Sequence, residues 1–168
     1  MPRDIPLLGG HVDASFADSP GKRSTLGQLY WFLGGVIDWK SKKSTRVLDS
    51  STDAECASLV VFGKENTWMR DVLTELGIFE VNAPTVVGED NTAAIALSGQ
   101  GPTKRSRHFD IAFYKFKQQV EYREMVLRYV KTSENPADFF TKALSKPKFF
   151  YFRDIIMGGE ELQRHIFN

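Results

Sequence analysis

The first half of the chain shows the two-residue periodicity of β-strands. Residues 11–16 alternate between apolar and polar side chains, so this strand has one apolar and one polar face. Large apolar side chains fill residues 25–33, and the two glycines that follow predict a hairpin whose return strand starts in residues 36–40. We also expect a short strand at residues 46–48. This half therefore predicts a meander of antiparallel strands.

A helical period replaces this alternation from about residue 53 to residue 76. Apolar side chains recur every three or four residues, and Gly77 ends the pattern. Two features mark the start of the helix. Ser51 and Thr52 are N-cap residue types, and Thr52 with Glu55 fits the spacing of a capping box. The pattern thus predicts one long helix in which Glu55 has a capping function.

The second half of the chain alternates between strands and helices. The expected elements are, in order, a buried strand at residues 85–87 that runs into Glu89-Asp90, a short helix at 92–97, a loop at 98–107, a helix at 109–122, a strand at 124–130, a helix that opens at Asn135-Pro136, and intermittent helix at 146–157. A meander followed by crossover connections implies an α/β fold, with a mixed sheet and helices on its faces. Three tryptophans fall in apolar patterns, so we expect Trp31, Trp39 and Trp68 in the core.

Composition places the chain among globular proteins. Of its 168 residues, 42% are apolar and 26% are charged, which argues against disorder and suits one domain. No segment approaches the ~18 consecutive apolar residues that span a bilayer. The single cysteine, Cys56, excludes an internal disulfide and predicts an intracellular protein. We expect one domain over residues 1–158, followed by a C-terminal tail at residues 159–168.

The net charge is only +1, so the positions of the basic residues matter more than their number. A domain that held nucleic acid by overall charge alone would be strongly basic. Here basic residues gather in two segments, with Lys40, Lys42, Lys43 and Arg46 in the first and Lys104, Arg105 and Arg107 in the second. Each segment is either a contact to a nucleic-acid backbone or a solvated loop, and the sequence favours neither interpretation.

Four acidic residues lie where they can serve a common site. Asp13 lies within a strand, where aspartate is depleted, and Asp90 follows a buried strand. Glu55 and Asp138 fall in the first turns of helices. Neighbouring strands can bring such carboxylates together at one edge of a sheet. Carboxylates clustered without histidine or cysteine are hard oxygen ligands, typical of magnesium or manganese sites. Two such ions about 4 Å apart promote phosphodiester cleavage.

Each of these carboxylates also has a structural interpretation. Glu55 completes the capping box unless its side chain turns toward a metal. Glu55 and Asp138 are favoured electrostatically at helix N-termini in any protein. Asp90 and Asn91 are a common turn and N-cap pair. Taken singly, these residues do not establish a metal site, and the segments around them carry more information.

Those segments resemble the ribonuclease H domain at the C-terminal end of copia-type (Pseudoviridae) retrotransposon polyproteins. The resemblance covers roughly residues 11–158. It rests on residues 12–17 (VDASFA), 22–25 (KRST), 39–43 (WKSKK), 50–55 (SSTDAE), 89–95 (EDNTAAI), 107–111 (RHFDI) and 135–142 (NPADFFTK). Each segment alone is a loose match, whereas all of them in this order are specific.

The resemblance implies a ribonuclease H-like α/β fold, in which a five-stranded mixed sheet of order 3-2-1-4-5 is flanked by helices. It implies a catalytic tetrad that also holds two Mg²⁺ ions, for which Mn²⁺ can substitute: Asp13, Glu55, Asp90 and Asp138. Asp13 would bridge the two ions, Asp138 would help hold the ion that activates water, and Glu55 with Asp90 would hold the other ion. A histidine that helps cellular enzymes of this fold is absent from residues 131–136, and we expect His108 to be structural.

The activity implied is that of an endoribonuclease that hydrolyses the RNA strand of RNA–DNA hybrids during reverse transcription. RNA selectivity would come from contacts to 2′-hydroxyls. The candidate nucleic-acid contacts are Lys40, Lys42, Lys43, Asn91, Lys104, Arg105 and Arg107. The partners implied are the hybrid and the reverse-transcriptase domain of the same polyprotein, without a membrane and with the isolated domain monomeric. The location implied is a cytoplasmic virus-like particle, with the nucleus as the alternative.

Two other functions stay open from the sequence. The first is a domesticated ribonuclease H-fold module that binds nucleic acid or a partner without cutting. The second is a DNA nuclease or integrase-like enzyme of the same fold. The four acidic positions favour the endoribonuclease, because a binding module has no need of them.

Overall fold

The computed structural model describes residues 7–78, 82–99 and 111–158. Its elements are, in chain order, β1 (Leu8–Ser15), β2 (Thr25–Phe32), β3 (Gly35–Lys43), α1 (Ser51–Glu75), β4 (Thr85–Glu89), α2 (Thr92–Gly99), α3 (Ile111–Glu121), β5 (Met125–Tyr129), the short 3₁₀ segments η2 (Thr132–Glu134) and η3 (Pro136–Phe140), and α4 (Lys146–Ile156). The expected tail at residues 159–168 and residues 100–107 of the expected loop lie outside the described residues.

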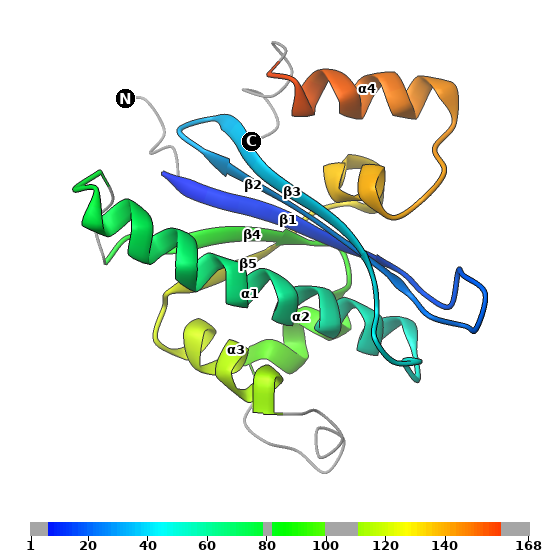
Figure 1. Cartoon of the computed structure of the whole chain (residues 1–168), viewed down its shortest axis with the longest axis horizontal. Coiled ribbons are helices and arrows are strands. Elements are labelled where there is room, and N and C mark those ends of the chain that lie inside the picture. The colour runs from blue at the N-terminus through cyan, green and yellow to red at the C-terminus, as the bar shows by residue number, and fades with distance from the viewer. Residues whose placement is uncertain (1–6, 79–81, 100–110, 159–168) are drawn as a thin grey trace.

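The five strands form one mixed sheet in the order β3-β2-β1-β4-β5, which confirms the predicted topology. β1 runs antiparallel to β2 and parallel to β4, while β2–β3 is an antiparallel hairpin and β4–β5 a parallel pair. Helices α1, α2 and α3 lie on one side of the sheet, and η3 and α4 lie on the other (Figure 1). The two central strands β1 and β2 are therefore covered on both faces, which explains why nearly all their residues are buried.

Glycines in the two central strands let the covering layers approach closely. A Cβ at Gly10 would collide with the ring of Phe62 from α1, and a Cβ at Gly27 would lie 2.5 Å from Thr141 Cγ2 on the opposite face. On the α1 side, Tyr30 stacks on Phe62 with ring centroids 4.1 Å apart and donates a hydrogen bond to its carbonyl oxygen. Close packing on both faces fixes the position of β1, the strand that carries Asp13.

The short strand expected at residues 46–48 does not form, so this prediction is wrong. β3 continues as far as Lys43, and the chain then turns toward the start of α1. Leu48 is buried against Ala14, Leu26 and Ala54. Its apolar side chain therefore fills the space between β1, β2 and α1, and the local pattern of residues 46–48 could not distinguish this use from a strand.

Only one of the three tryptophans enters the core. Trp31 in β2 is 4% exposed, whereas Trp39 and Trp68 are each 61% exposed, so the prediction is wrong for these two. Trp39 lies on β3, an edge strand whose residues are mostly exposed. Trp68 lies on α1 outside the core, where it lines a pocket with Ile37 and Asp38 of the edge strand β3.

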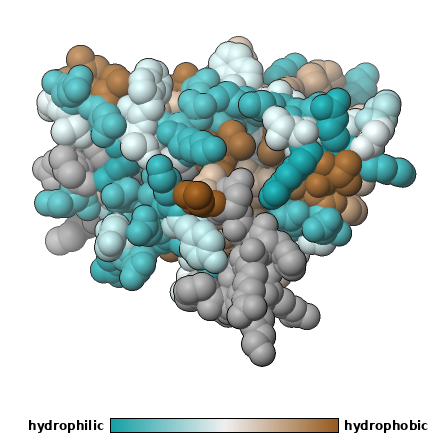
Figure 2. Space-filling model, turned by 60° about the horizontal axis from the view of Figure 1, so that its bottom comes forward, coloured by the Kyte–Doolittle hydropathy of each residue, from teal (hydrophilic) through white to brown (hydrophobic). Residues whose placement is uncertain are grey.

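One face of the molecule, drawn in Figure 2, is mainly polar. On the face drawn in Figure 2, hydrophilic side chains predominate and hydrophobic side chains appear as separate patches. Among the described residues, no helix combines the length and the apolar composition needed to cross a membrane.

The N-terminus of α1 is capped before both predicted N-cap residues, one residue before Ser51 and two before Thr52. Ser50 is the N-cap, and its side chain accepts a hydrogen bond of 3.1 Å from the backbone N–H of Asp53. The Asp53 carboxylate in turn accepts from the N–H of Asp49 at 3.0 Å. The predicted capping box of Thr52 and Glu55 is therefore wrong, and Glu55 is free of the capping function.

We expect Ser50→Ala to lower the free energy of unfolding by about 1 kcal/mol, because it removes the acceptor for the first-turn N–H. Urea denaturation of the wild type and the variant measures this difference. Ser51→Ala is the matched control, since Ser51 is the next residue, is exposed, and takes no part in the cap. Equal losses in the two variants would contradict the assignment of Ser50 as the cap.

Candidate functional site

Asp13 lies near the end of β1, at the centre of the sheet, and is fully buried. The parallel pairing of β1 with β4 includes His11 opposite Gly88. Continuing this register by two residues brings Asp13 level with Asp90, which directly follows β4. The predicted convergence of these two carboxylates thus follows from the strand pairing itself.

Helix α1 supplies the third carboxylate of the site. The Ser58 hydroxyl lies 3.1 Å from both the Asp13 and the Gly27 carbonyl oxygens and anchors the helix to the two central strands. Glu55 lies one turn earlier on the same face of α1 and is buried. As a result, Asp13, Glu55 and Asp90 each present a carboxylate oxygen, and these oxygens all lie within 4.8 Å of one another.

Asp138 comes from the opposite side of the sheet, in η3. Asn135 fixes this segment against β1, because its side-chain amide donates to the Val12 carbonyl oxygen at 2.8 Å. Asp138 is also buried, but it is linked to Asp13 through a lysine. The Lys142 ammonium lies 2.7 Å from Asp138 Oδ1 and 3.1 Å from Asp13 Oδ1. Of the four predicted carboxylates, three therefore form one cluster, and the fourth adjoins it across an ion pair.

A fifth carboxylate, Glu89, was missed by sequence reasoning. It is the last residue of β4, is fully buried, and accepts a hydrogen bond of 2.8 Å from the N–H of Asn91 through Oε1. Its other oxygen, Oε2, has no hydrogen-bond partner among the described residues. The signal available in the sequence was an acidic residue closing an otherwise apolar strand, beside an aspartate already singled out.

The buried carboxylates disfavour one another's ionisation. Burial, together with the nearby charges of Glu89 and Asp13, raises the pKa of Glu55 to about 10. Burial also raises the pKa of Glu89 to about 8, although its hydrogen bond from Asn91 opposes the shift. For Asp13, burial raises the pKa, while Lys142 and the Thr141 hydroxyl, which donates to Asp13 Oδ2, oppose the rise.

The donor set fits a divalent cation. Glu55 Oε2 is buried without a hydrogen-bond partner among the described residues, and it belongs to the carboxylate cluster. Buried carboxylate oxygens in this situation require a proton or a cation. All the candidate ligands are oxygens, which Mg²⁺ and Mn²⁺ prefer.

The predicted nucleic-acid contacts are used in different ways. Lys40 forms an ion pair with Glu65, and Lys43 lies 2.6 Å from the Thr25 hydroxyl and 3.4 Å from Asp18. The Asn91 side-chain oxygen caps α2 by accepting from the N–H groups of Ala93 and Ala94. The second basic segment, with Lys104, Arg105 and Arg107, and the neighbouring His108 lie outside the described residues.

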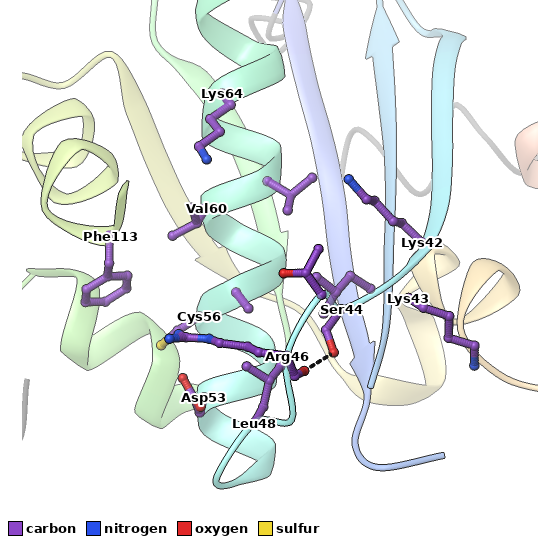
Figure 3. Close-up of a pocket in the computed structure, with 14 residues that line it drawn as sticks. Lys42, Lys43, Ser44, Arg46, Leu48, Asp53, Cys56, Val60, Lys64 and Phe113 are labelled. Atoms are coloured by element: carbon purple, nitrogen blue, oxygen red, sulfur yellow. Dashed lines mark hydrogen bonds between the residues drawn. The ribbon is translucent and has the colours of Figure 1, made fainter. Parts of the chain in front are cut away.

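A basic pocket of about 240 Å³ lies beside the N-terminal half of α1. Its lining includes Lys42, Arg46 and Lys64, and none of the three forms an ion pair within the described part of the chain. Figure 3 shows the Arg46 side chain lying across α1 toward Cys56, with Lys64 further along the helix. Sequence reasoning found Lys42 and Arg46 but missed Lys64, which lies 18 residues after Arg46 in the sequence and reaches the pocket only through the position of α1.

Comparison with known proteins identifies relatives in retrotransposon polyproteins. No family model matches the chain. It is 33% identical over 153 residues to the retrovirus-related Pol polyprotein from transposon TNT 1-94 of Nicotiana tabacum, a match that covers 90% of the chain and 11% of the polyprotein. It is 34% identical over 148 residues to that from transposon RE1 of Arabidopsis thaliana, covering 86% and 10%. A Ty1-DR5 Gag-Pol polyprotein of Saccharomyces cerevisiae is 26% identical over 132 residues, covering 79% and 8%.

Solved structures share the fold at low sequence identity. LC11-RNase H1, isolated from compost by a metagenomic approach, aligns with a TM-score of 0.62 at 13% identity, covering 82% of this chain and 94% of that chain. The structure of LC11-RNase H1 in complex with an RNA/DNA hybrid aligns with a TM-score of 0.58 at 15% identity, covering 80% and 93%. Identities this low show the fold alone.

The sequence relatives and the solved structures with the same fold are consistent with each other. The chain spans about a tenth of the length of the curated relatives it matches, but those matches extend over most of its own length. The chain therefore belongs to the Pol polyprotein family of Ty1/copia retrotransposons, as a region with the ribonuclease H-like fold.

Proposed function

We propose that the chain is a metal-dependent endoribonuclease that hydrolyses the RNA strand of RNA–DNA hybrids during retrotransposon reverse transcription. The observation that carries this proposal is the convergence of Asp13, Glu55 and Asp90, from three separate elements, within 4.8 Å. A binding module has no need to bury carboxylates against their mutual repulsion. A nuclease needs them to hold the cation that its chemistry requires.

The residues present define how two cations would be held. Asp13, Glu55 and Asp90 would hold the first, and Asp13 with Asp138 would hold the second. Mg²⁺, or Mn²⁺ in its place, supplies a lowered pKa for bound water and stabilisation of charge on the phosphate. The chain's own contribution is to fix the carboxylates, which it does through the backbone anchors of Ser58 and Asn135.

The basic pocket supports a nucleic-acid substrate. Lys42, Arg46 and Lys64 line it along the N-terminal half of α1, the helix that also carries Glu55, and these cations suit contacts to a phosphate backbone. A hybrid is the substrate favoured by the family, and a solved ribonuclease H with the same fold is in complex with one. We propose Lys40, Lys43, Asn91, Lys104, Arg105 and Arg107 as further contacts to the hybrid.

Membership of a Pol polyprotein family supports the remaining proposals. The reverse-transcriptase domain of the same polyprotein is the proposed protein partner. The isolated domain, residues 1–158, would be monomeric, and its location would be the cytoplasmic virus-like particle or the nucleus. Binding of the hybrid without cleavage would instead favour the domesticated, non-catalytic module.

We expect Asp13→Asn to reduce the rate of hybrid cleavage on the order of 10²–10³-fold, the loss typical of removing one electrostatic stabiliser of the transition state. A labelled RNA–DNA hybrid incubated with Mg²⁺ measures the rate, and duplex DNA serves as the alternative substrate. Asp71→Asn, an exposed carboxylate on α1, is the control that should keep full activity. Undiminished cleavage by Asp13→Asn would contradict the proposed site.

The stability of the metal-free protein should fall as the pH rises from about 5 to about 8. Glu89 keeps its proton up to about pH 8 in the folded chain but loses it near 4.5 when unfolded, so in this window the folded state binds more protons. Glu89→Gln cannot ionise and retains the acceptor for the Asn91 N–H. We expect it to flatten the pH dependence by up to about 1.4 kcal/mol per pH unit.

Urea denaturation in EDTA across this pH range tests the Glu89 prediction. Glu75→Gln is the control, since Glu75 is exposed at the end of α1 and should keep the wild-type slope. Addition of Mg²⁺ should restore stability at pH 8, because a cation stabilises the ionised carboxylates. An equal slope in the wild type and Glu89→Gln would rule out Glu89 as a source of the pH dependence.

Arg46→Ala should weaken binding of the hybrid and reduce its salt dependence. Loss of one phosphate contact lowers the magnitude of the log–log salt slope by about 0.9. Fluorescence anisotropy with a labelled hybrid in EDTA, at several salt concentrations, measures both effects without cleavage. Arg128→Ala is the matched control, because Arg128 is exposed on β5 at the opposite edge of the sheet. Identical slopes in the two variants would remove the pocket from the proposed interface.

A further inference from the structure

The acidic site consists of two halves with different electrostatic partners. In the first half, Asp13, Glu55 and Asp90 approach one another, and Glu55 Oε2 has no hydrogen-bond partner among the described residues. In the second half, both oxygens of Asp138 are occupied by lysines: Oδ1 by Lys142 at 2.7 Å and Oδ2 by Lys148. The two proposed cation positions are therefore not equivalent.

The lysines also stand between these carboxylates and the solvent. The side chains of Asp13 and Asp138 are each 1% exposed, whereas those of Lys142 and Lys148 are 37% and 31% exposed. Both carboxylate oxygens of Asp13 also have partners. Oδ1 lies next to the Lys142 ammonium, and Oδ2 accepts a hydrogen bond from the Thr141 hydroxyl. A cation that binds Asp13 and Asp138 together must take oxygens already used by an ammonium group.

The two lysines come from different parts of the fold. Lys142 lies two residues after the end of η3, and its N–H donates to the Asp138 carbonyl oxygen at 3.1 Å, which fixes the i,i+4 pair. Lys148 comes from α4. This helix contacts η3 through Phe149, whose ring centroid lies 5.0 Å from that of Phe139. Lys148 also lies over the buried Phe152 ring, at 5.3 Å from its centroid.

We propose that Lys142 and Lys148 are resident counter-cations of the Asp138 half, which a second metal ion must displace. The inference rests on the proposed function, because it concerns the two-cation site. The first ion enters the Asp13, Glu55 and Asp90 cluster, where Lys142, at Asp13 Oδ1, is the one ammonium group within ion-pair distance among the described residues. The second ion competes with two ammonium groups for the same oxygens, so the ions bind in sequence and the lysines set the affinity for the second.

Titration of the full chain with Mn²⁺ tests this inference by isothermal calorimetry, with electron paramagnetic resonance to count the bound ions. The wild type should bind one ion and then a second at least about tenfold more weakly. The double variant Lys142→Gln/Lys148→Gln should bind the second ion at least about tenfold more tightly than the wild type, with the first ion changed much less.

Lys146→Gln is the matched control for this titration. It removes one positive charge from α4, the helix that carries Lys148, but Lys146 is exposed and forms no ion pair within the described residues. Its Mn²⁺ affinities should equal those of the wild type. Equal tightening in Lys146→Gln and the double variant would overturn the proposal, since a general loss of positive charge would then explain the effect.

A single variant keeps the test informative if the double variant does not fold. Lys148→Gln leaves Lys142 between the two carboxylates, and we expect an intermediate tightening of the second ion. It should also show a larger rise in melting temperature on addition of Mn²⁺ than the wild type. An unchanged or weakened second ion in Lys148→Gln, or two ions of equal affinity in the wild type, would overturn the proposal.

Failure of this inference is distinguishable from failure of the proposed function. The titration follows binding and the hybrid assay follows cleavage. Sequential binding that depends on the lysines, without hybrid cleavage, would support the lysine inference and reject the endoribonuclease. Cleavage with two ions insensitive to the lysines would reject the lysine inference alone.

Discussion

Burial of several carboxylates within a few ångströms of one another is the constraint on which this structure depends. Each of these carboxylates is stabilised in a different way. Asp138 has two lysines, Glu89 has the N–H of Asn91, and Asp13 shares Lys142 with Asp138 and accepts from Thr141. Glu55 Oε2 and Glu89 Oε2 have no hydrogen-bond partner among the described residues, but Glu89 keeps the bond from Asn91 through Oε1. The buried carboxylate of Glu55 is therefore the least compensated of the site, and a bound cation would stabilise the site most at this position.

The same constraint accounts for the two layers that cover the sheet. The carboxylates stay in place because α1 and η3 are each tied to the backbone of the central strands, through Ser58 and Asn135 respectively. Gly27 permits the close approach of Thr141 to the sheet, and Thr141 in turn donates to Asp13. Packing and electrostatics are thus coupled, since a bulkier residue at position 27 would displace the residue that holds Asp13.

The sequence predicted the helices and strands far better than it predicted the contacts between residues distant in the chain. Alternation and helical period identified the strands and α1 because these patterns are local. The N-cap was predicted at Thr52, two residues after Ser50, because Thr52 and Glu55 also fit the spacing of a capping box. Lys142 and Glu89 were passed over because their roles depend on residues far away in the chain. Lys142 meets Asp13 across 129 positions, a pairing that no periodicity reports.

The charge distribution follows from the same long-range pairing. The sequence left the basic segment of residues 40–46 open between a nucleic-acid contact and a solvated loop, and in the structure Lys40 faces Glu65 and Lys43 faces Asp18. The remaining cations, Lys42 and Arg46, combine with Lys64 from α1 to line one pocket. A chain of net charge +1 can thus carry a positive pocket, because ion pairs with Glu65 and Asp18 neutralise other cations of the same segment. Local arrangement of the charges, more than their total, determines where a phosphate backbone can bind.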